Sequence, residues 1–301
     1  MKTLVFGSLN IDLIFSVDHI VKGGETISCS SFKRSAGGKG ANQAAALAKA
    51  GLSVWMAGTI GADGRFLTRL LESYGVDTEL VNEYEGASGQ ALIQLDKTGQ
   101  NSIVLYEGGN GAISEAQIER ALSRFEAGDM VVLQNEIRHT ALIMKKAKER
   151  GLRIALNPSP FDERIETLPL ANADILFVNE IEGAALANFK EAGEGEGADF
   201  NAVLDALMRR FPHTEIILTA GKHGAYYGFK NVREFAPIVQ CPVVDTTGAG
   251  DTFLGYFLAA RARNLTAEHA LSVACKAAAL AVSRAGAMEA IPQADEIWTS
   301  K

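Results

Sequence analysis

The amino-acid sequence predicts a three-layer α/β fold in which helices cover both faces of a doubly wound, mostly parallel sheet. The first observation is a series of short apolar runs bounded by turn residues, as expected of strands buried on both faces. They are TLVFG, VWMAG, MVVLQ, RIALNP, ILFVN and EIILTAG. The second observation is that segments with apolar residues at helical spacing alternate with these runs. They are AAALAKAG, RFLTRLLESYG, EAQIERALSRF, LIMKKAKERG, FNAVLDALMRRF, 249–263 and 267–283.

Two segments, 9–34 and 88–107, interrupt this alternation. They contain the strand-like stretches IDLIFSV, ETISCSSF, GQALIQLD and NSIVLYEG, with no helical pattern between them. We expect a small β-sheet lid that covers one edge of the main domain and turns one face toward a ligand or a second subunit. The whole chain, 1–301, is then a single domain that carries the lid strands as insertions. The acidic, glycine-rich stretch EAGEGEGA at 191–198 is expected to be a solvated loop.

The composition is that of a globular protein with small ligands. The 301 residues are 47% hydrophobic and 22% charged, which leaves room for a sizeable core. The net charge of -7 argues against a nucleic-acid partner, because such partners are bound by clustered positive charge. Three distant cysteines, Cys29, Cys241 and Cys275, favour a reducing cytoplasm over a disulfide scaffold. No window approaches the ~18 apolar residues of a membrane span, so we expect no membrane partner.

The segment SAGGKGANQAAALAKAG, at 35–51, is a glycine-rich turn that leads into an alanine-rich helix. It matches neither the P-loop pattern nor GxGxxG. Gly37, Gly38 and Gly40 give the backbone freedom, and Lys39 and Asn42 stand beside the start of the helix. Close approach of a polar ligand and a tight turn that begins a helix are equally good interpretations of this segment alone.

Polar side chains also stand beside the first predicted strand. GSLNID places Asn10 and Asp12 two residues apart, so in an extended segment both side chains point to the same face. An amide next to a carboxylate suits a polyol, whose hydroxyls both donate and accept hydrogen bonds. The alternative is a turn in which these side chains bond their own backbone.

Later strands end in LQNE, LNPSP, FVNEIE and TAGKHG, which supply Glu136, Asn157, Asn179, Glu182 and Thr219. Because ligands of open α/β sheets bind at the carboxyl ends of the strands, these residues are expected to outline the rim of a ligand site. TAGKHG offers a hydroxyl and two glycines to a nucleotide, or it forms a turn between a strand and a hairpin.

The stretch DTTGAGDTF, at 245–253, is the strongest chemical signal. The amides of Gly248, Ala249, Gly250 and Asp251 would lie at the start of a long helix, where the helix dipole favours an anion. If they hold a phosphoryl group, Asp251 is placed to accept the proton of an attacking hydroxyl. If Asp251 only caps the helix, its own carboxylate occupies the anion site that these amides form.

With these residues in order, the chain resembles the ribokinase family, the pfkB-type carbohydrate kinases. The resemblance covers essentially the whole chain, and it is carried by GSLNID, GGKGANQA, LQNE, LNPSP, NEIE, TAGKHGA, DTTGAGDTF and SRAGAMEAIP. It implies an α/β domain with a β-sheet lid, ATP as phosphoryl donor, magnesium bridging the phosphates and a homodimer formed through the lid.

The resemblance also implies a role for individual residues. The catalytic group comprises the base Asp251 and the anion hole at Gly248, Ala249 and Gly250. The sugar contacts are Asn10, Asp12, Gly38, Lys39, Asn42, Glu136 and Asp251. The nucleotide contacts are Asn179, Thr219, Gly221, Gly224, Gly250 and Cys275. Glu182 acts on magnesium through water.

A monovalent-cation site, occupied by potassium, is implied beside the anion hole. Its ligands would come from Asp245, Thr247, Ala281, Arg284, Gly286 and Ala290. Ribokinases often have a serine where this chain has Ala290, so a backbone carbonyl would replace the hydroxyl here.

Within the family, GGKGANQA together with Asn10 and Asp12 most resembles the kinases of ribose. The expected reaction is therefore transfer of the ATP γ-phosphate to the 5-hydroxyl of D-ribose. Another pentose, a ketohexose or a nucleoside is the alternative acceptor, since the sequence does not fix the pocket volume. A sensor without turnover is a more distant alternative, against which the intact Asp251 argues, and a dinucleotide-dependent oxidoreductase lacks its GxGxxG fingerprint.

Overall fold

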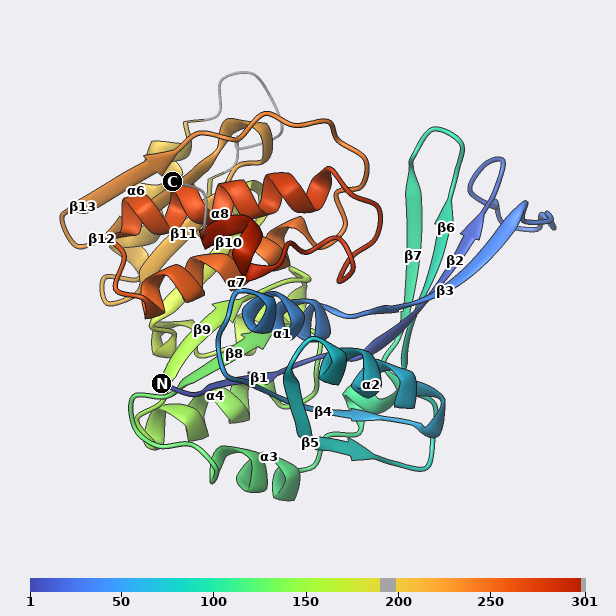
Figure 1. Ribbon diagram of the computed structural model, residues 1–301, viewed down its shortest axis with the longest axis horizontal. Helices are drawn as coiled ribbons and strands as arrows, with labels where there is room; N and C mark the ends of the chain where they lie inside the picture. The colour runs from blue at the N-terminus through green and yellow to red at the C-terminus, as the bar shows by residue number, and fades with distance from the viewer. Residues whose placement is uncertain (190–198, 299–301) are drawn as a thin grey trace.

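The computed structural model describes residues 1–189 and 199–298, so the predicted loop at 191–198 lies outside the described residues. The described chain forms a nine-stranded sheet in the order β13-β12-β11-β10-β9-β8-β1-β4-β5 and a separate four-stranded sheet in the order β3-β2-β6-β7. Figure 1 shows the smaller sheet extending away from the larger one. We call it the small sheet.

The large sheet is parallel over most of its width. Its strands are β1 (Thr3–Phe6), β4 (Val54–Ile60), β5 (Val76–Glu83), β8 (Met130–Gln134), β9 (Arg153–Asn157), β10 (Ile175–Asn179), β11 (Glu215–Thr219), β12 (Ala225–Phe229) and β13 (Val232–Ala236). All neighbours from β11 to β5 pair in parallel, and β12 and β13 add an antiparallel edge. The six predicted apolar runs are β1, β4, β8, β9, β10 and β11, which confirms their assignment as buried strands.

Helices cover both faces of the large sheet and complete the predicted three layers. One face carries α1 (Lys39–Lys49), α2 (Arg65–Ser73), α7 (Ala249–Ala262), α8 (Ala267–Val282) and α9 (Ala294–Trp298). The other face carries α3 (Glu115–Leu122), α4 (Thr140–Glu149), α5 (Glu180–Leu186) and α6 (Phe200–Arg210). Neighbouring strand residues alternate between the two cores: Val5 packs under the first set of helices, whereas Leu4 and Phe6 pack under the second. In the described part of the chain no helix is long and apolar enough to cross a membrane.

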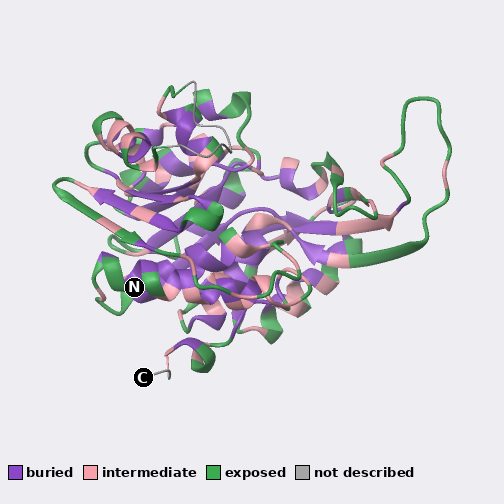
Figure 2. Ribbon diagram, turned by 90° about the horizontal axis from the view of Figure 1, so that it is seen from above, coloured by how far each residue is buried: buried purple, intermediate pink, exposed green. Residues whose placement is uncertain are grey.

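The small sheet is built from β2 (Asn10–Ser16), β3 (Ser31–Gly37), β6 (Gly89–Leu95) and β7 (Asn101–Tyr106). Much of its outer part is exposed (Figure 2). Its register places Asp12 opposite Ala91, and Ala91 opposite Leu105, so these three residues share one face. The same face continues outward through Ile14, Ile93 and Ile103.

One predicted strand, ETISCSSF at 25–32, was wrong in its position. The structure has β3 at Ser31–Gly37, and the residues before it are not in a strand. The reason is the length of the partner strand: β2 ends at Ser16, which pairs with Ser31, so residues before Ser31 lie beyond the end of that strand. The same pairing carries β3 on to Gly37, opposite Asn10, and thus into the glycine-rich turn.

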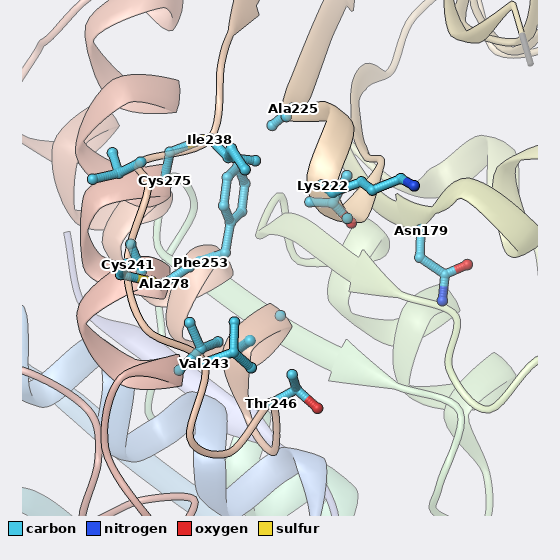
Figure 3. A pocket seen from close by; sticks show the side chains of 18 of the residues that line it. Asn179, Lys222, Ala225, Ile238, Cys241, Val243, Thr246, Phe253, Cys275 and Ala278 are labelled. Carbon is cyan, nitrogen blue, oxygen red and sulfur yellow. The ribbon is translucent and has the colours of Figure 1, made fainter. Parts of the chain in front are cut away.

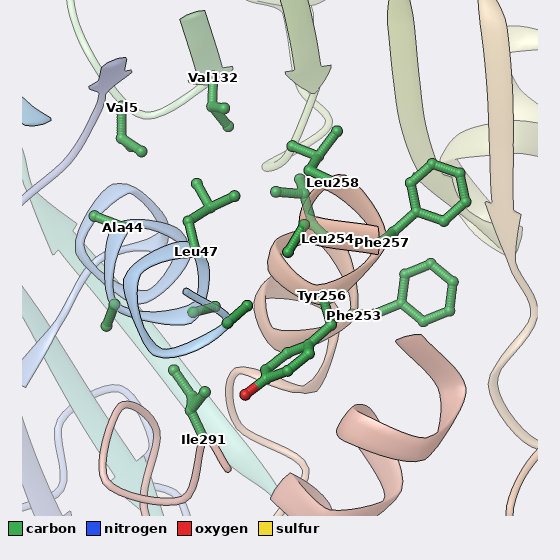
Figure 4. Packing of buried hydrophobic residues seen from close by; sticks show 14 of the residues in the cluster. Val5, Ala44, Leu47, Val132, Phe253, Leu254, Tyr256, Phe257, Leu258 and Ile291 are labelled. Atoms are coloured by element: carbon green, nitrogen blue, oxygen red, sulfur yellow. The ribbon is translucent and has the colours of Figure 1, made fainter. Parts of the chain in front are cut away.

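Helices α1 and α7 lie side by side over the large sheet, with Leu47 and Leu254 among the apolar side chains packed around them (Figure 4). Their backbones approach closely at Gly255. A Cβ built there would lie 2.5 Å from Cβ of Ala46 and 2.8 Å from its carbonyl carbon. Only glycine fits at this crossing without separating the two helices.

We expect Gly255→Ala to destabilise the protein. Alanine favours a helix by about 1 kcal/mol over glycine, but overpacking against rigid backbone costs about 1–3 kcal/mol, so the clash should prevail. The free energy of unfolding in urea measures the balance. Gly250→Ala is the matched control, because a Cβ on this glycine of the same helix meets no atom within 4 Å. A Gly255→Ala protein as stable as the wild type would contradict the close approach.

Candidate active site

The carboxyl ends of the parallel strands gather polar residues, three of which, Asn157, Asn179 and Thr219, the sequence predicted there. Gln134 and Asn157 end β8 and β9, and Asn179 and Thr219 end β10 and β11. These strands are neighbours in the large sheet, so the four side chains line one edge. The helices that face this edge bring the remaining groups.

Helix α7 begins at this edge with the stretch GAGD. Gly248 precedes its first residue with φ of 73°, a left-handed conformation that favours glycine. The amide of Ala249 lies 3.3 Å from the carbonyl oxygen of Thr246, whereas among the described residues the amides of Gly250 and Asp251 have no hydrogen-bond acceptor. The start of α7 therefore presents free donors at the positive end of a fourteen-residue helix.

Asp251 does not cap this helix. It is the third helical residue, is 6% exposed, and accepts hydrogen bonds from two amides of α1. Nδ2 of Asn42 donates to its Oδ2 at 3.0 Å, and Nε2 of Gln43 donates to its Oδ1 at 2.8 Å. The carboxylate is held by α1, across the crossing of the two helices.

A group of charged side chains surrounds Lys39, the first residue of α1. The backbone amide of Lys39 donates to Oε2 of Glu136 at 3.0 Å, and the Ser8 hydroxyl donates to the same carboxylate. Burial lowers the pKa of Lys39, but the charges of Asp251, Glu136 and Glu182 outweigh burial and raise it above its usual value. Lys39 is therefore a charged ammonium among three carboxylates.

Two carboxyl groups here hold their protons more tightly than usual. Burial raises the pKa of Glu136, although the charge of Lys39 and the hydrogen bonds to the carboxylate oppose this effect. Burial and the nearby Glu136 raise the pKa of Asp12 to about 7. Both groups therefore favour the protonated form more than a carboxyl in water does.

A cavity of about 230 Å³ opens between the small sheet and the large sheet. It is lined by Asn10, Leu105, Tyr106, Glu107, Asn110, Glu136, Pro160 and Arg164. Asn110 orients Asn10, since its Nδ2 donates to Oδ1 of Asn10 at 2.7 Å while its Oδ1 accepts from the amide of Leu9 at 3.1 Å. Amide and carboxyl groups at this cavity offer both donors and acceptors.

The glycine-rich turn beside this cavity has a structural need for its glycines. Gly38 has φ of 93°, and a Cβ there would lie 2.9 Å from the carbonyl oxygen of Ser8. A Cβ on Gly37 would lie 2.1 Å from the carboxylate of Asp12. The turn thus begins α1 and leaves room for Asp12, which confirms the interpretation as a tight turn that begins a helix; the approach of a polar ligand stays a prediction.

A second cavity, of about 670 Å³, lies between the edge of the large sheet and helices α7 and α8 (Figure 3). All six residues predicted to contact a nucleotide line it: Asn179, Thr219, Gly221, Gly224, Gly250 and Cys275. Its apolar wall includes Ile238, Val243 and Phe253, which suits a flat aromatic ring. TAGKHG joins β11 to the β12–β13 hairpin, so it is a turn and also lines the cavity.

The sulfur of Cys275 has no reactive role that the structure supports. Burial raises the pKa of this thiol to about 11, so it remains protonated and packs as a small apolar group. All three cysteines are free.

Both carboxylate oxygens of Glu182 accept hydrogen bonds from other residues of the protein. It is 5% exposed, and its Oε2 accepts from the amide of Asn179 at 3.0 Å while Oδ1 of Asn179 accepts from its amide at 2.8 Å. This is a capping box at the start of α5. Its Oε1 accepts from the hydroxyl of Ser159. Within 1–189 and 199–298 there is no group of three or more His, Cys, Asp or Glu side chains placed to hold a metal ion.

Asp245 ties together the two segments predicted to bind a monovalent cation. Its Oδ1 accepts from the amide of Thr247 at 2.9 Å, and its Oδ2 accepts from the amide of Gly286 at 3.0 Å. Burial opposes its ionisation, but the hydrogen bonds from Thr247 and Gly286 prevail and hold the pKa of Asp245 below its usual range. Ala281 and Ala290 are buried beside this loop, and Arg284 pairs with Glu296.

Sequence reasoning missed several polar residues of the site. Ser8, Gln43, Asn110 and Ser159 each bond a residue that it had singled out, and Gln134 bonds Gln43. Gln43 could have been found, because it and Asn42 are the polar pair within an alanine-rich helix. Asn110 and Ser159 come close to the site only through the fold, so no local pattern marks them.

Comparison with known proteins places the chain in a family. A model described as pfkB family carbohydrate kinase matches residues 2–294. The chain belongs to this family. The ribokinase of Bacillus subtilis (strain 168) is 35% identical over 298 residues, which cover 97% of this chain and 97% of that protein.

Solved structures of this family confirm the fold. The crystal structure of ribokinase from Cryptococcus neoformans var. grubii serotype A in complex with ADP has a TM-score of 0.88 and 32% identity, covering 99% of this chain and 98% of that one. The structure of Arabidopsis thaliana ribokinase complexed with ribose and ATP has a TM-score of 0.84 and 29% identity, covering 99% and 97%. The predicted ribokinase-like architecture is therefore correct.

The raised pKa of Asp12 predicts a pH dependence of stability. Its folded pKa of about 7 lies above the value of about 4 expected in the unfolded chain, so the unfolded state loses this proton first. The stability contributed by Asp12 is thus fully present below about pH 4 and is lost as the pH rises to about 7. Asp12→Asn should flatten this decline in the free energy of unfolding.

Urea denaturation from about pH 4.5 to pH 8 measures the effect. Asp18→Asn is the control, since Asp18 is 72% exposed and the hydrogen bond from Lys97 keeps its pKa low. An unchanged slope for Asp12→Asn would show that Asp12 titrates as it does in water.

Proposed function

We propose that this chain is an ATP-dependent kinase that transfers the γ-phosphate to the 5-hydroxyl of D-ribose. One observation carries the proposal: the buried carboxylate of Asp251 belongs to the first turn of α7, next to the free amide of Gly250, and lies close to the ammonium of Lys39. Gly250 lines the larger cavity, so a phosphoryl group at the start of α7 would lie next to the base. Membership of a carbohydrate kinase family supports the same reaction class.

In this reaction Asp251 accepts the proton of the sugar 5-hydroxyl as the hydroxyl oxygen attacks the γ-phosphorus. The bond between the γ-phosphorus and the bridging oxygen of ADP breaks, and ADP leaves. The anion hole for the charge of the transferred group would lie at Gly248, Ala249 and Gly250, where the amide of Gly250 has no acceptor among the described residues and that of Ala249 lies 3.3 Å from the carbonyl oxygen of Thr246. Because the amides are fixed by the helix, they need no rearrangement when that charge moves.

The remaining residues bind the two substrates. The sugar would be held by Asn10, Asp12, Gly38, Lys39, Asn42 and Glu136; Asn10 and Glu136 line the smaller cavity, and the other four are not among its lining residues. The nucleotide would occupy the larger cavity, against Asn179, Thr219, Gly221, Gly224, Gly250 and Cys275. The solved relative complexed with ribose and ATP supports this choice of ligands.

A magnesium ion would be held mainly by phosphate oxygens, with water between it and Glu182. This arrangement fits the structure, because both oxygens of Glu182 already accept hydrogen bonds within the fold and few protein ligands are at hand. When bound, the ion would neutralise part of the phosphate charge.

A potassium ion would sit beside the anion hole, in the loop that Asp245 closes. The donor set suits it, since a carboxylate and backbone carbonyls of Thr247, Ala281, Arg284, Gly286 and Ala290 are hard oxygen ligands. Comparison of turnover in potassium chloride and tetramethylammonium chloride tests this site.

We infer that the small sheet is a lid inserted in a single domain, and that two copies join through it in a cytoplasmic homodimer. The lid carries Asn10 and Asp12 on the face that continues through Ile14, Ile93 and Ile103, so closure would shield the sugar from water. Ile103 and Leu105 are half exposed, which leaves apolar surface for a second copy to cover. Sedimentation velocity tests the dimer, and cell fractionation tests the location.

The acceptor is tested with a panel of sugars and nucleosides in a coupled assay of ADP release. D-ribose should give the highest kcat/KM among ribose, 2-deoxyribose, arabinose, fructose and adenosine. Another acceptor that exceeds ribose tenfold would replace the ribose assignment and leave the kinase assignment in place. Absence of ADP release with every acceptor would favour a sensor without turnover.

Asp251→Asn should abolish turnover while ribose and ATP still bind. The amide cannot accept the hydroxyl proton, and general-base catalysis contributes about 10²–10⁴-fold in rate. Single-turnover kinetics and calorimetric titration with each ligand measure the two effects. Turnover within a few-fold of the wild type would show that another group is the base.

Gly250→Ala should fold normally and lose activity. Its Cβ meets no protein atom within 4 Å, but it would project where the phosphoryl group is proposed to bind. We expect kcat/KM for ATP to fall by about 10²-fold, comparable to loss of one oxyanion-hole donor. Normal ATP kinetics in this variant would place the phosphoryl group elsewhere.

A further inference from the structure

Gln43 is a fully buried amide that joins three elements of the site. It lies on α1, and its Nε2 donates to Oδ1 of Asp251 on α7 at 2.8 Å. The same Nε2 lies 3.3 Å from Oδ1 of Asn157 at the end of β9. Gln43 lines neither of the two cavities, so its contact with the site runs through Asp251.

Gln134 fixes which end of the Gln43 amide faces Asp251. It ends β8, is fully buried, and its Nε2 donates to Oε1 of Gln43 at 2.6 Å. If the Gln43 amide were reversed, its oxygen would face the Asp251 carboxylate and its NH₂ would face the NH₂ of Gln134. The NH₂ group of Gln134 therefore donates to the oxygen of Gln43, and the NH₂ group of Gln43 donates to the carboxylate of Asp251.

The fold leaves Gln134 little freedom to turn. A Cβ on Gly7 would lie 2.1 Å from Oε1 of Gln134, so the side chain packs directly against the backbone at the end of β1. This Oε1 is buried and has no hydrogen-bond partner among the described residues. An unpaired buried acceptor costs stability, and an apolar residue of similar shape would avoid that cost. The position thus favours a role in the site over a role in packing.

We propose that Gln43 and Gln134 are positioning residues that hold the carboxylate of Asp251 in its reactive orientation. The inference rests on the proposed function of Asp251 as the base. Asn42 holds the other carboxylate oxygen at 3.0 Å, so the two neighbouring amides of α1 grip both oxygens. Without Gln43 the carboxylate can rotate away from the sugar hydroxyl, and a misplacement of about 1 Å can cost about 10²-fold in rate.

The test compares Gln43→Met and Gln134→Met, which keep the length of the side chain and remove its hydrogen bonds. Gln43→Met should lower kcat about 10- to 100-fold and leave KM for D-ribose and ATP within about twofold, because the loss is confined to the reacting step. Gln134→Met should lower kcat less. The double variant should be no slower than Gln43→Met alone, since Gln134 acts through Gln43.

Gln117→Met is the matched control. Gln117 is 2% exposed, its Nε2 donates to the carbonyl of Gly58 at 2.6 Å, and its Oε1 accepts from the hydroxyl of Thr59 at 2.9 Å. Its replacement removes a similar pair of buried hydrogen bonds far from Asp251. We expect a lower Tm with unchanged kcat. If Gln43→Met does not fold, Gln134→Met, one contact further from Asp251, carries the same test.

The possible outcomes separate this inference from the proposed function. A raised KM for ribose with unchanged kcat would mean that Gln43 binds sugar, and unchanged kinetics with a lowered Tm would mean that it only packs; either result overturns the inference. Asp251→Asn is measured alongside. If it is inactive and Gln43→Met is fully active, only the positioning role fails; if it remains active, the proposed base itself fails.

Discussion

The close crossing of α1 and α7 is the constraint on which the site depends. Gly255 lets the two backbones meet at Ala46, and the same approach brings Asn42 and Gln43 of α1 within hydrogen-bond distance of Asp251 on α7. Asp251 is buried, and its burial is tolerable only because both carboxylate oxygens accept hydrogen bonds. A separation of α1 and α7 that is a few tenths of an ångström larger would weaken both hydrogen bonds at once. The packing of the two helices and the position of the Asp251 carboxylate therefore depend on the same interhelical distance.

The site also contains more carboxyl groups than positively charged groups. Glu136, Glu182 and Asp251 lie around the ammonium of Lys39, and Asp12 lies close to Glu136. The fold handles each carboxyl differently: Glu182 is used in a capping box, Asp251 is held by amides, and Asp12 and Glu136 favour protonation. Of these carboxyl groups Glu136 lines the cavity between the sheets, where the amides of Asn10 and Asn110 add both donors and acceptors for a molecule with several hydroxyls.

Much of the fold could be predicted from the sequence, because buried parallel strands and long amphipathic helices have strong local patterns. The six apolar runs became strands of the large sheet, whereas β5 and β13 were missed because these edge strands mix polar and apolar residues; β12, which lies between β11 and β13, was missed as well. α5 was missed because seven residues are too few to show a helical period. The residues singled out around Asp251 do lie together, but Asn110 and Ser159 joined them only through tertiary contacts, which no local pattern encodes.

The wall of the smaller cavity is divided between a rigid part and an adaptable part. Asn10 begins β2, and Glu136 follows the end of β8, where Gln134 also lies. Leu105 and Tyr106 belong to β7, the exposed edge strand of the small sheet, which pairs with β6. Substitutions on such a strand cost little stability. Under the proposed function, β7 forms one part of the acceptor site, whereas the sugar contact Asn42 also holds Asp251. Evolution or a designer can reshape β7 for a larger or differently substituted acceptor while Asp251 and its partners stay untouched.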